Sequence, residues 1–296
     1  MSEPTPVTAA SAALPSLFVS HGAPTIALED GPAQRFLAVL GARLGRPRAV
    51  LMVSAHWETN EVAVMATPAP ATIHDFFGFP EPLYALRYPA PGDTALAGRI
   101  AALLRGAGYA VTADDSRGYD HGAWVPMRLM YPSADVPLVQ LSINPQRPPA
   151  WHWRLGRSLR PLCHEGVLVV GSGSMTHNLQ DFRRHRDEVD CPVEPYAAEF
   201  TEWFAQQLAA RELDALLAYR EFAPHAARAH PTDEHLLPFF VALGAAGIGW
   251  SAERVHHGFM HGAIAMDCYR FQSGSAVECA SPDHYNVSTS GEKHVQ

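Results

Sequence analysis

The chain has 296 residues, of which 47% are hydrophobic and 18% are charged, and its formal net charge is −8. This balance excludes wholesale disorder, and the negative charge disfavours binding to the phosphate backbone of nucleic acids. No run of about 18 apolar residues occurs, so we expect no membrane-spanning helix.

The chain is expected to form a single domain over residues 16–274. Residues 1–15 are rich in Ala, Ser, Thr and Pro and lack the basic and apolar regions of a secretory signal, so we expect a disordered leader. Residues 275–296 form a polar tail. No two of the four cysteines have C-x-x-C spacing, which favours reduced thiols in a cytoplasmic protein over a thiolate metal cluster.

Apolar segments typical of buried strands alternate along the chain with segments of helical periodicity. The expected strands cover residues 16–20, 49–54, 136–143, 167–171 and 263–271. The expected helices cover residues 31–44, 93–106, 151–163, 193–208 and 234–243. This alternation predicts an α/β fold with a largely parallel central sheet flanked by helices, and an active site at the carboxyl ends of the strands.

Three histidines share one sequence context. His21, His56 and His177 each come shortly after the end of an expected strand. In an open α/β sheet this is the edge at which ligands bind, so the three imidazoles are expected to converge there. Because neutral imidazole is the commonest metal ligand in proteins, the pattern indicates a metal site rather than three unrelated loop residues.

A fourth ligand is expected from residues 229–238, AHPTDEHLLP. Thr232 or Asp233 has the character of a helix N-cap, which would place Glu234 and His235 in the first helical turn. Neighbouring helical positions point about 100° apart, so only one of the two side chains can face the site easily. A two-histidine, one-carboxylate iron site would use Glu234, and an all-nitrogen site would use His235. The spacing leaves both alternatives open.

Two further segments are candidates for a pocket wall. Residues 74–80, HDFFGFP, contain His74, Phe76 and Phe77, and residues 120–124, DHGAW, contain His121 and Trp124. Aromatic walls with a few polar groups suit a planar aromatic ligand. The alternative is that these are ordinary core aromatics beside a loop.

Six ordered motifs, VSHGAP, VSAHWET, IHDFFGFP, YDHGAW, GSGSMTHNL and HPTDEHLLP, resemble those of the class III extradiol ring-cleavage dioxygenases. The chain is most similar to the branch that contains the 4,5-DOPA dioxygenases, over about Leu17 to Cys268. Ser174 and Asp233 depart from the usual G-S-G-N and P-T-P-E-H forms of two motifs, which bears on substrate preference rather than on the chemistry.

The resemblance implies one mononuclear metal, Fe(II) in the working enzyme, with Zn(II) able to occupy the site in purified protein. It assigns His21, His56 and His235 as ligands, so that His235 rather than Glu234 is the ligand from residues 229–238. It implies that His177 lies close to the metal as an acid/base, and as a fourth ligand in the resting site. It also makes His121 a second proton-transfer or substrate-contact residue.

The expected function is O2-dependent extradiol cleavage of a small catecholic substrate, with His74, Phe76, Phe77 and Trp124 contacting the ring. No nucleic-acid or membrane partner is expected. Two alternatives use the same histidines: a zinc-dependent hydrolase, since three histidines and a water make a catalytic zinc site, and a non-catalytic metal or small-molecule binding protein. Oxygen uptake with a catechol separates the first function from both alternatives.

Overall fold

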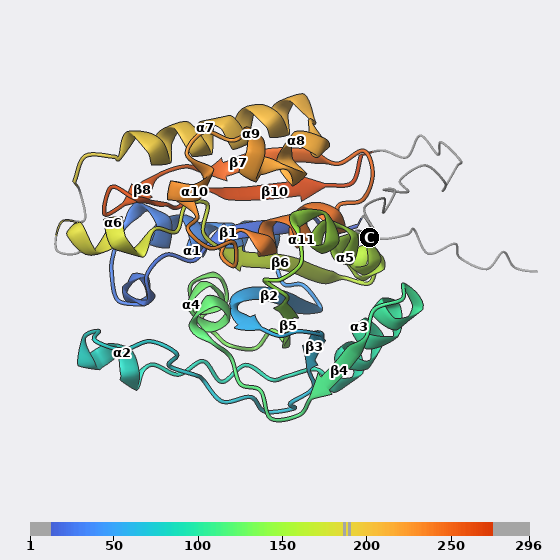
Figure 1. Ribbon diagram of the computed structural model, residues 1–296. Coiled ribbons are helices and arrows are strands. Elements are labelled where there is room, and N and C mark those ends of the chain that lie inside the picture. The colour runs from blue at the N-terminus through green and yellow to red at the C-terminus, as the bar shows by residue number, and fades with distance from the viewer. Residues whose placement is uncertain (1–12, 186–187, 189–190, 275–296) are drawn as a thin grey trace, which may run out of the picture.

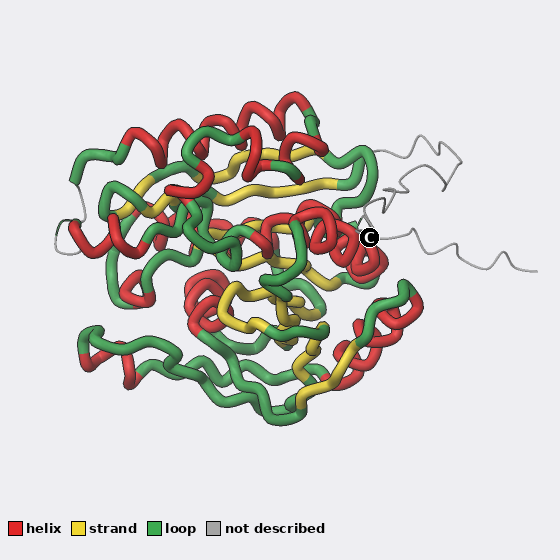
Figure 2. The backbone as a smooth tube through the Cα atoms, in the orientation of Figure 1, coloured by secondary structure: helices red, strands yellow, loops and turns green. Residues whose placement is uncertain are grey.

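The computed structural model describes residues 13–185, 188 and 191–274, so the expected leader up to residue 12 and the expected tail lie outside the described residues. Strands alternate with helices along most of this chain (Figures 1 and 2). The strands are β1 (Ser16–Ser20), β2 (Ala49–Glu58), β3 (Val62–Met65), β4 (Val111–Asp114), β5 (Leu138–Ile143), β6 (Val167–Gly173), β7 (Ser251–His256), β8 (Phe259–Met260), β9 (Ile264–Ala265) and β10 (Cys268–Gln272).

The helices vary from a single turn to four turns. They are η1 (Pro24–Ala27, 3-10), α1 (Pro32–Leu44), α2 (Glu81–Ala85), α3 (Thr94–Gly106), α4 (His121–Met130), α5 (Pro149–His164), α6 (Leu179–Arg184), α7 (Pro195–Ala210), α8 (Leu213–Leu217), α9 (Tyr219–Phe222), α10 (Ala226–Ala229) and α11 (Leu237–Ala245). Among the described residues, none of these helices has the length and apolar character needed to cross a membrane.

Eight strands form one mixed sheet in the order β4-β3-β5-β2-β6-β1-β10-β7. The four central strands β5, β2, β6 and β1 run parallel to one another. At one edge β10 is antiparallel to β1 and β7 is antiparallel to β10, and at the other edge β3 is antiparallel to β5 and parallel to β4. Helices cover both faces (Figure 1). The expected α/β fold with a largely parallel central sheet is therefore confirmed, with antiparallel additions that the sequence pattern did not predict.

The central strands are buried on both faces, which explains their continuous apolar sequences. Val50 and Met52 of β2 pack in one core cluster with α1 and α4. Their neighbours Leu51 and Val53 pack in a second cluster with α3, α5 and α11. Alternate side chains of one strand thus anchor helices on opposite sides of the sheet, which fixes the loops at its carboxyl edge.

Several boundaries differ from the expected ones. Strand β2 continues to Glu58 instead of ending at residue 54, so His56 lies inside the strand rather than after its end. The helix expected from Glu234 begins at Leu237, because Pro238 lacks an N–H and fits only in the first helical turn. Glu234 and His235 therefore lie in a turn that precedes α11. The strand expected over residues 263–271 is divided: β9 pairs with the short strand β8, and β10 joins the main sheet.

Candidate metal centre and pocket

The order of the central strands brings three of the candidate histidines to one edge. Strand β6 lies between β2 and β1 and is parallel to both. His21 directly follows β1, His56 is near the carboxyl end of β2, and His177 lies four residues after β6. The backbone N–H of His21 also donates to the carbonyl of Gly173, which ties the two strand ends together.

Two further histidines lie at the same edge, His121 at the start of α4 and His235 in the turn before α11. His121 is the first residue of α4, whose amino end is capped by the buried carboxylate of Asp120. His235 is held by the backbone N–H of Ser174, which donates to its carbonyl at 2.9 Å. At Gly173 a Cβ would lie 2.0 Å from that same carbonyl, so only glycine lets the turn approach β6 this closely.

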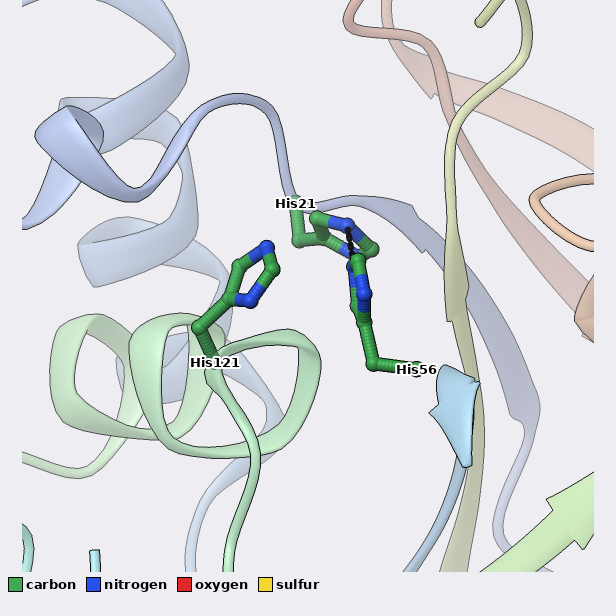
Figure 3. Close-up of side chains that lie close together, drawn as sticks. All are labelled: His21, His56 and His121. Atoms are coloured by element: carbon green, nitrogen blue, oxygen red, sulfur yellow. Dashed lines mark hydrogen bonds between the residues drawn. The ribbon is translucent and has the colours of Figure 1, made fainter. Parts of the chain in front are cut away.

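The imidazoles of the five histidines converge. Nε2 of His21 and Nε2 of His56 are 3.1 Å apart, and Figure 3 shows the rings of His21, His56 and His121 turned toward one another. The ring centroids of His56 and His235 are 4.8 Å apart. The rings of His177 and His235 are stacked, with centroids 3.4 Å apart.

A hydrogen-bond chain fixes the tautomer of His21. The Ser172 hydroxyl donates its single proton to the carbonyl of Gly122, so it must accept a hydrogen bond from Nδ1 of His21, 2.9 Å away. The proton of neutral His21 is therefore on Nδ1, and the lone pair on Nε2 faces His56. This is the arrangement that a metal-ligating histidine needs from its second ring nitrogen.

Two carboxylates lie beside the Nδ1 atoms of the other four histidines. Glu234 Oε1 is 2.9 Å from Nδ1 of His235 and 3.4 Å from Nδ1 of His177. Asp75 Oδ1 is 3.0 Å from Nδ1 of His121, and its Oδ2 is 3.7 Å from Nδ1 of His56. The carboxylates thus lie beside the nitrogens that would remain free if each ring bound an ion through Nε2.

The protonation states favour metal binding. Burial, reinforced by the neighbouring imidazoles, lowers the pKa of His21 and of His56 well below the ordinary value. Burial also lowers the pKa of His235 to about 3, although Glu234 opposes the shift. Burial alone would raise the pKa of Glu234, but hydrogen bonds from His177 and His235 outweigh it, so that the pKa is lowered and the carboxylate is ionised. Neutral imidazoles with free lone pairs are the form that a metal ion requires.

The histidines contribute to the wall of a cavity of about 280 Å³. Its lining consists of His21, Gly22, Ala23, Pro24, His56, Phe76, Phe79, His121, Ser174, His177, Leu179, Phe182, His235 and Ile264. All five histidines discussed above are in this lining. Among the described residues, the donor atoms of His21, His56 and His121 form one group suited to a metal ion, and those of His177, Glu234 and His235 form a second.

Of the four residues expected to contact the ring, His74, Phe76, Phe77 and Trp124, only Phe76 lines the cavity. Phe77 is 91% exposed and lies outside it. Trp124 is completely buried and donates from its indole N–H to the carbonyl of Ile73, so it belongs to the core beneath α4. His74 contacts the carbonyl of Leu86 through Nε2 and also lies outside the cavity lining.

Several residues of the site were missed from the sequence. Phe79, Leu179, Phe182 and Ile264 line the cavity, and Asp75 lies behind two of the histidines. The signal for Phe79 and Asp75 was present, because both belong to the same HDFFGFP segment as Phe76. Leu179 and Phe182 follow His177 in the chain, three residues apart on α6, and this spacing places both on one face of the helix.

Comparison with known proteins agrees with this geometry. Residues 15–272 match the family described as the catalytic LigB subunit of aromatic ring-opening dioxygenase. A Beta vulgaris protein named 4,5-DOPA dioxygenase extradiol is 41% identical, over 87% of this chain and 96% of its own length. An Escherichia coli K12 protein of the same name is 43% identical, over 79% of this chain and 86% of its own length.

The fold also matches a solved structure. The crystal structure of an uncharacterized protein from Escherichia coli K12 has a TM-score of 0.72 and 36% sequence identity, and the match covers 87% of this chain and 99% of that one. The chain belongs to the LigB family of class III extradiol dioxygenases, the aromatic ring-opening enzymes that include the DOPA dioxygenases.

Proposed function

We propose that this enzyme cleaves the ring of a small catechol beside one of its two hydroxyls, in an O2-dependent reaction at a mononuclear Fe(II) site. The observation that carries the proposal is the cluster of five imidazoles in the wall of a cavity whose other lining residues, Ser174 apart, are apolar. The names of the relatives support a 4,5-DOPA-type position of cleavage.

His21, His56 and His235 are the proposed metal ligands. His21 and His235 are buried, His56 is partly buried, and all three have a lowered pKa. The Nδ1 atoms of His21 and His235 are hydrogen-bonded to Ser172 and Glu234. The donor set therefore fits a divalent transition metal, which prefers nitrogen ligands of this kind. When bound, Fe(II) would supply the open coordination positions at which a catechol and O2 react.

His177 and His121 are proposed to handle protons. His177 would accept a proton from a catechol hydroxyl and return it later, with Glu234 beside its Nδ1 to stabilise the charged ring. The carboxylate of Asp75 lies beside Nδ1 of His121, as that of Glu234 lies beside Nδ1 of His177. The ring centroid of His121 lies 5.7 Å from that of Phe76. His121 could therefore contact a ring that packs on Phe76.

Anaerobic reconstitution of the metal-free protein with Fe(II), followed by a panel of catechols and O2, tests the proposal. We expect consumption of one O2 per catechol and the appearance of a yellow ring-opened product. The same protein loaded with Zn(II) should show no oxygen uptake. Iron-loaded protein that consumes no O2 with any catechol would contradict the proposal, and hydrolysis of an ester or amide by the zinc form would favour a hydrolase.

A further inference from the structure

The lining of the cavity has two chemically different parts. Among the histidines, His21 is 2% exposed and His235 is 4% exposed, whereas the side chains of His56 and His177 are 20% and 18% exposed. The second part is an apolar wall, in which Leu179 is 46% exposed, and it consists of Pro24, Phe76, Phe79, Leu179, Phe182 and Ile264. A catechol whose hydroxyls point to the histidines would place a ring substituent against this apolar wall.

Among the described residues that line the cavity, none has a carboxylate, an ammonium or a guanidinium group. Besides the histidines, the only polar side chain in this lining is that of Ser174, and its hydroxyl already donates to the carbonyl of Thr176 at 2.7 Å. The carboxylates of Glu234 and Asp75 are outside the lining and contact histidine Nδ1 atoms.

Helix α6 contributes apolar side chains to the cavity and keeps its buried carboxylate out of it. Leu179 and Phe182 contribute to the cavity wall. Asp181 is instead buried outside the cavity lining, where it forms ion pairs with Arg184 at 2.8 Å and with Arg228 at 3.1 Å. Arg184 and Arg228 are therefore paired with a carboxylate outside the cavity lining, and Arg183, which directly follows Phe182, is exposed and also outside that lining.

We propose that the substrate is a catechol with an uncharged, apolar substituent rather than one with an amino-acid side chain. This inference rests on the proposed function. Against this wall, the ammonium and carboxylate of an amino acid would lose water without gaining a partner, which is costly for charged groups. An alkyl substituent would instead bury apolar surface against Phe182, Leu179 and Ile264.

The test compares 4-propylcatechol with DOPA on the full-length, Fe(II)-loaded protein. Anaerobic titration gives Kd, and O2 uptake gives kcat/KM. We expect 4-propylcatechol to exceed DOPA at least tenfold in kcat/KM, on the order of what one or two well-buried methylene groups provide. Dopamine and 3,4-dihydroxyphenylacetate each carry a single charge, and their kcat/KM values should lie between those of 4-propylcatechol and DOPA. Equal or better use of DOPA would overturn this inference alone, whereas no O2 uptake with any catechol would overturn the proposed function as well.

Two arginine substitutions test whether the cavity wall determines the preferred ring substituent. Leu179→Arg should shift the kcat/KM ratio of 3,4-dihydroxyphenylacetate to 4-propylcatechol roughly tenfold toward the carboxylate, because the new guanidinium would lie in the cavity wall. Gln180→Arg adds the same charge at the next residue, which is exposed and outside the lining, and should leave the ratio within about twofold of the parent. Equal shifts in both variants would mean that long-range charge rather than the wall selects the substituent, and would overturn the inference.

Discussion

Glu234 accepts a hydrogen bond from Nδ1 of His235 at 2.9 Å, and the same oxygen lies 3.4 Å from Nδ1 of His177. The two imidazoles are stacked with only 15° between their planes. One carboxylate is therefore in position to orient a proposed ligand and a proposed acid/base at the same time. Its lowered pKa keeps it ionised at neutral pH, so it acts as an acceptor toward both rings.

Glu234→Gln should weaken metal binding by about 10- to 100-fold, the usual effect of removing a hydrogen-bond partner of a ligating histidine. His235→Ala should remove most of the bound metal, because it deletes a ligand. Competition with a chromophoric chelator measures both affinities, and circular dichroism checks the fold. Glu212→Gln is the matched control, because Glu212 is exposed and outside the cavity lining. A fully loaded His235→Ala protein together with an empty Glu234→Gln protein would identify the carboxylate as the true ligand.

The positions of His21, His56 and His177 could be predicted from sequence because they depend on one robust rule. Apolar runs identify the central strands, and parallel strands place their carboxyl ends along one edge of the sheet. The orientation of Glu234 could not be predicted in this way. It lies next to His235 in sequence, and only the turn before Pro238 decides which of the two side chains enters the cavity.

The aromatic wall shows the limit of motif-based prediction. Trp124 is three residues after His121 on α4, and its indole packs under the helix instead of facing the pocket. Phe182 lines the cavity because α6 contributes to its wall, a long-range arrangement for which local periodicity gives no signal. The aromatic residues of HDFFGFP therefore identified a segment that lines the cavity, but the sequence did not show which of its side chains face the cavity.

Phe76 and Phe77 form a natural matched pair for testing the wall. Phe76→Ala should raise KM for the preferred catechol about tenfold or more, because Phe76 lines the cavity and a large buried contact is lost. Phe77→Ala should change KM less than twofold, since that side chain is 91% exposed and outside the lining. Metal content, measured on both proteins, should equal that of the parent. Equal KM values for the two variants would contradict the position of Phe76 as a substrate contact.

A pH-dependent contribution to stability is expected from His152, which is distant in sequence from the cavity residues and completely buried. Its Nδ1–H donates to the carbonyl of Pro148, and its Nε2 accepts from the N–H of Asn144, so the ring is held neutral. Burial lowers its pKa to about 4, although the bond to Pro148 opposes the shift. As the pH falls below about 6.5, the unfolded chain binds a proton that the folded protein does not, so stability is lost down to about pH 4.

His152→Gln should remove this contribution. Between pH 7 and pH 5 the free energy of unfolding of the parent should fall by about 2 kcal/mol more than that of the variant, at equal metal loading. Urea unfolding at the two pH values measures the difference. Parallel losses of stability in the two proteins would show that His152 titrates normally in the folded state.

A variant of His177 can show whether this residue acts as a metal ligand or as an acid/base. Its backbone N–H is tied to the carbonyl of Ala229, and its ring lies at the cavity wall, stacked on His235. With His21, His56 and His235 as ligands, a permanently bound fourth imidazole would crowd the positions that a catechol and O2 need. His177→Gln should therefore retain nearly stoichiometric Fe(II) and still bind catechol, while kcat falls about 10²- to 10⁴-fold, the range typical for loss of a general acid or base. Iron titration and anaerobic catechol binding, followed by single-turnover absorbance after O2 is added, separate these steps. A variant that cannot hold iron would make His177 an obligatory ligand and would exclude the acid/base assignment.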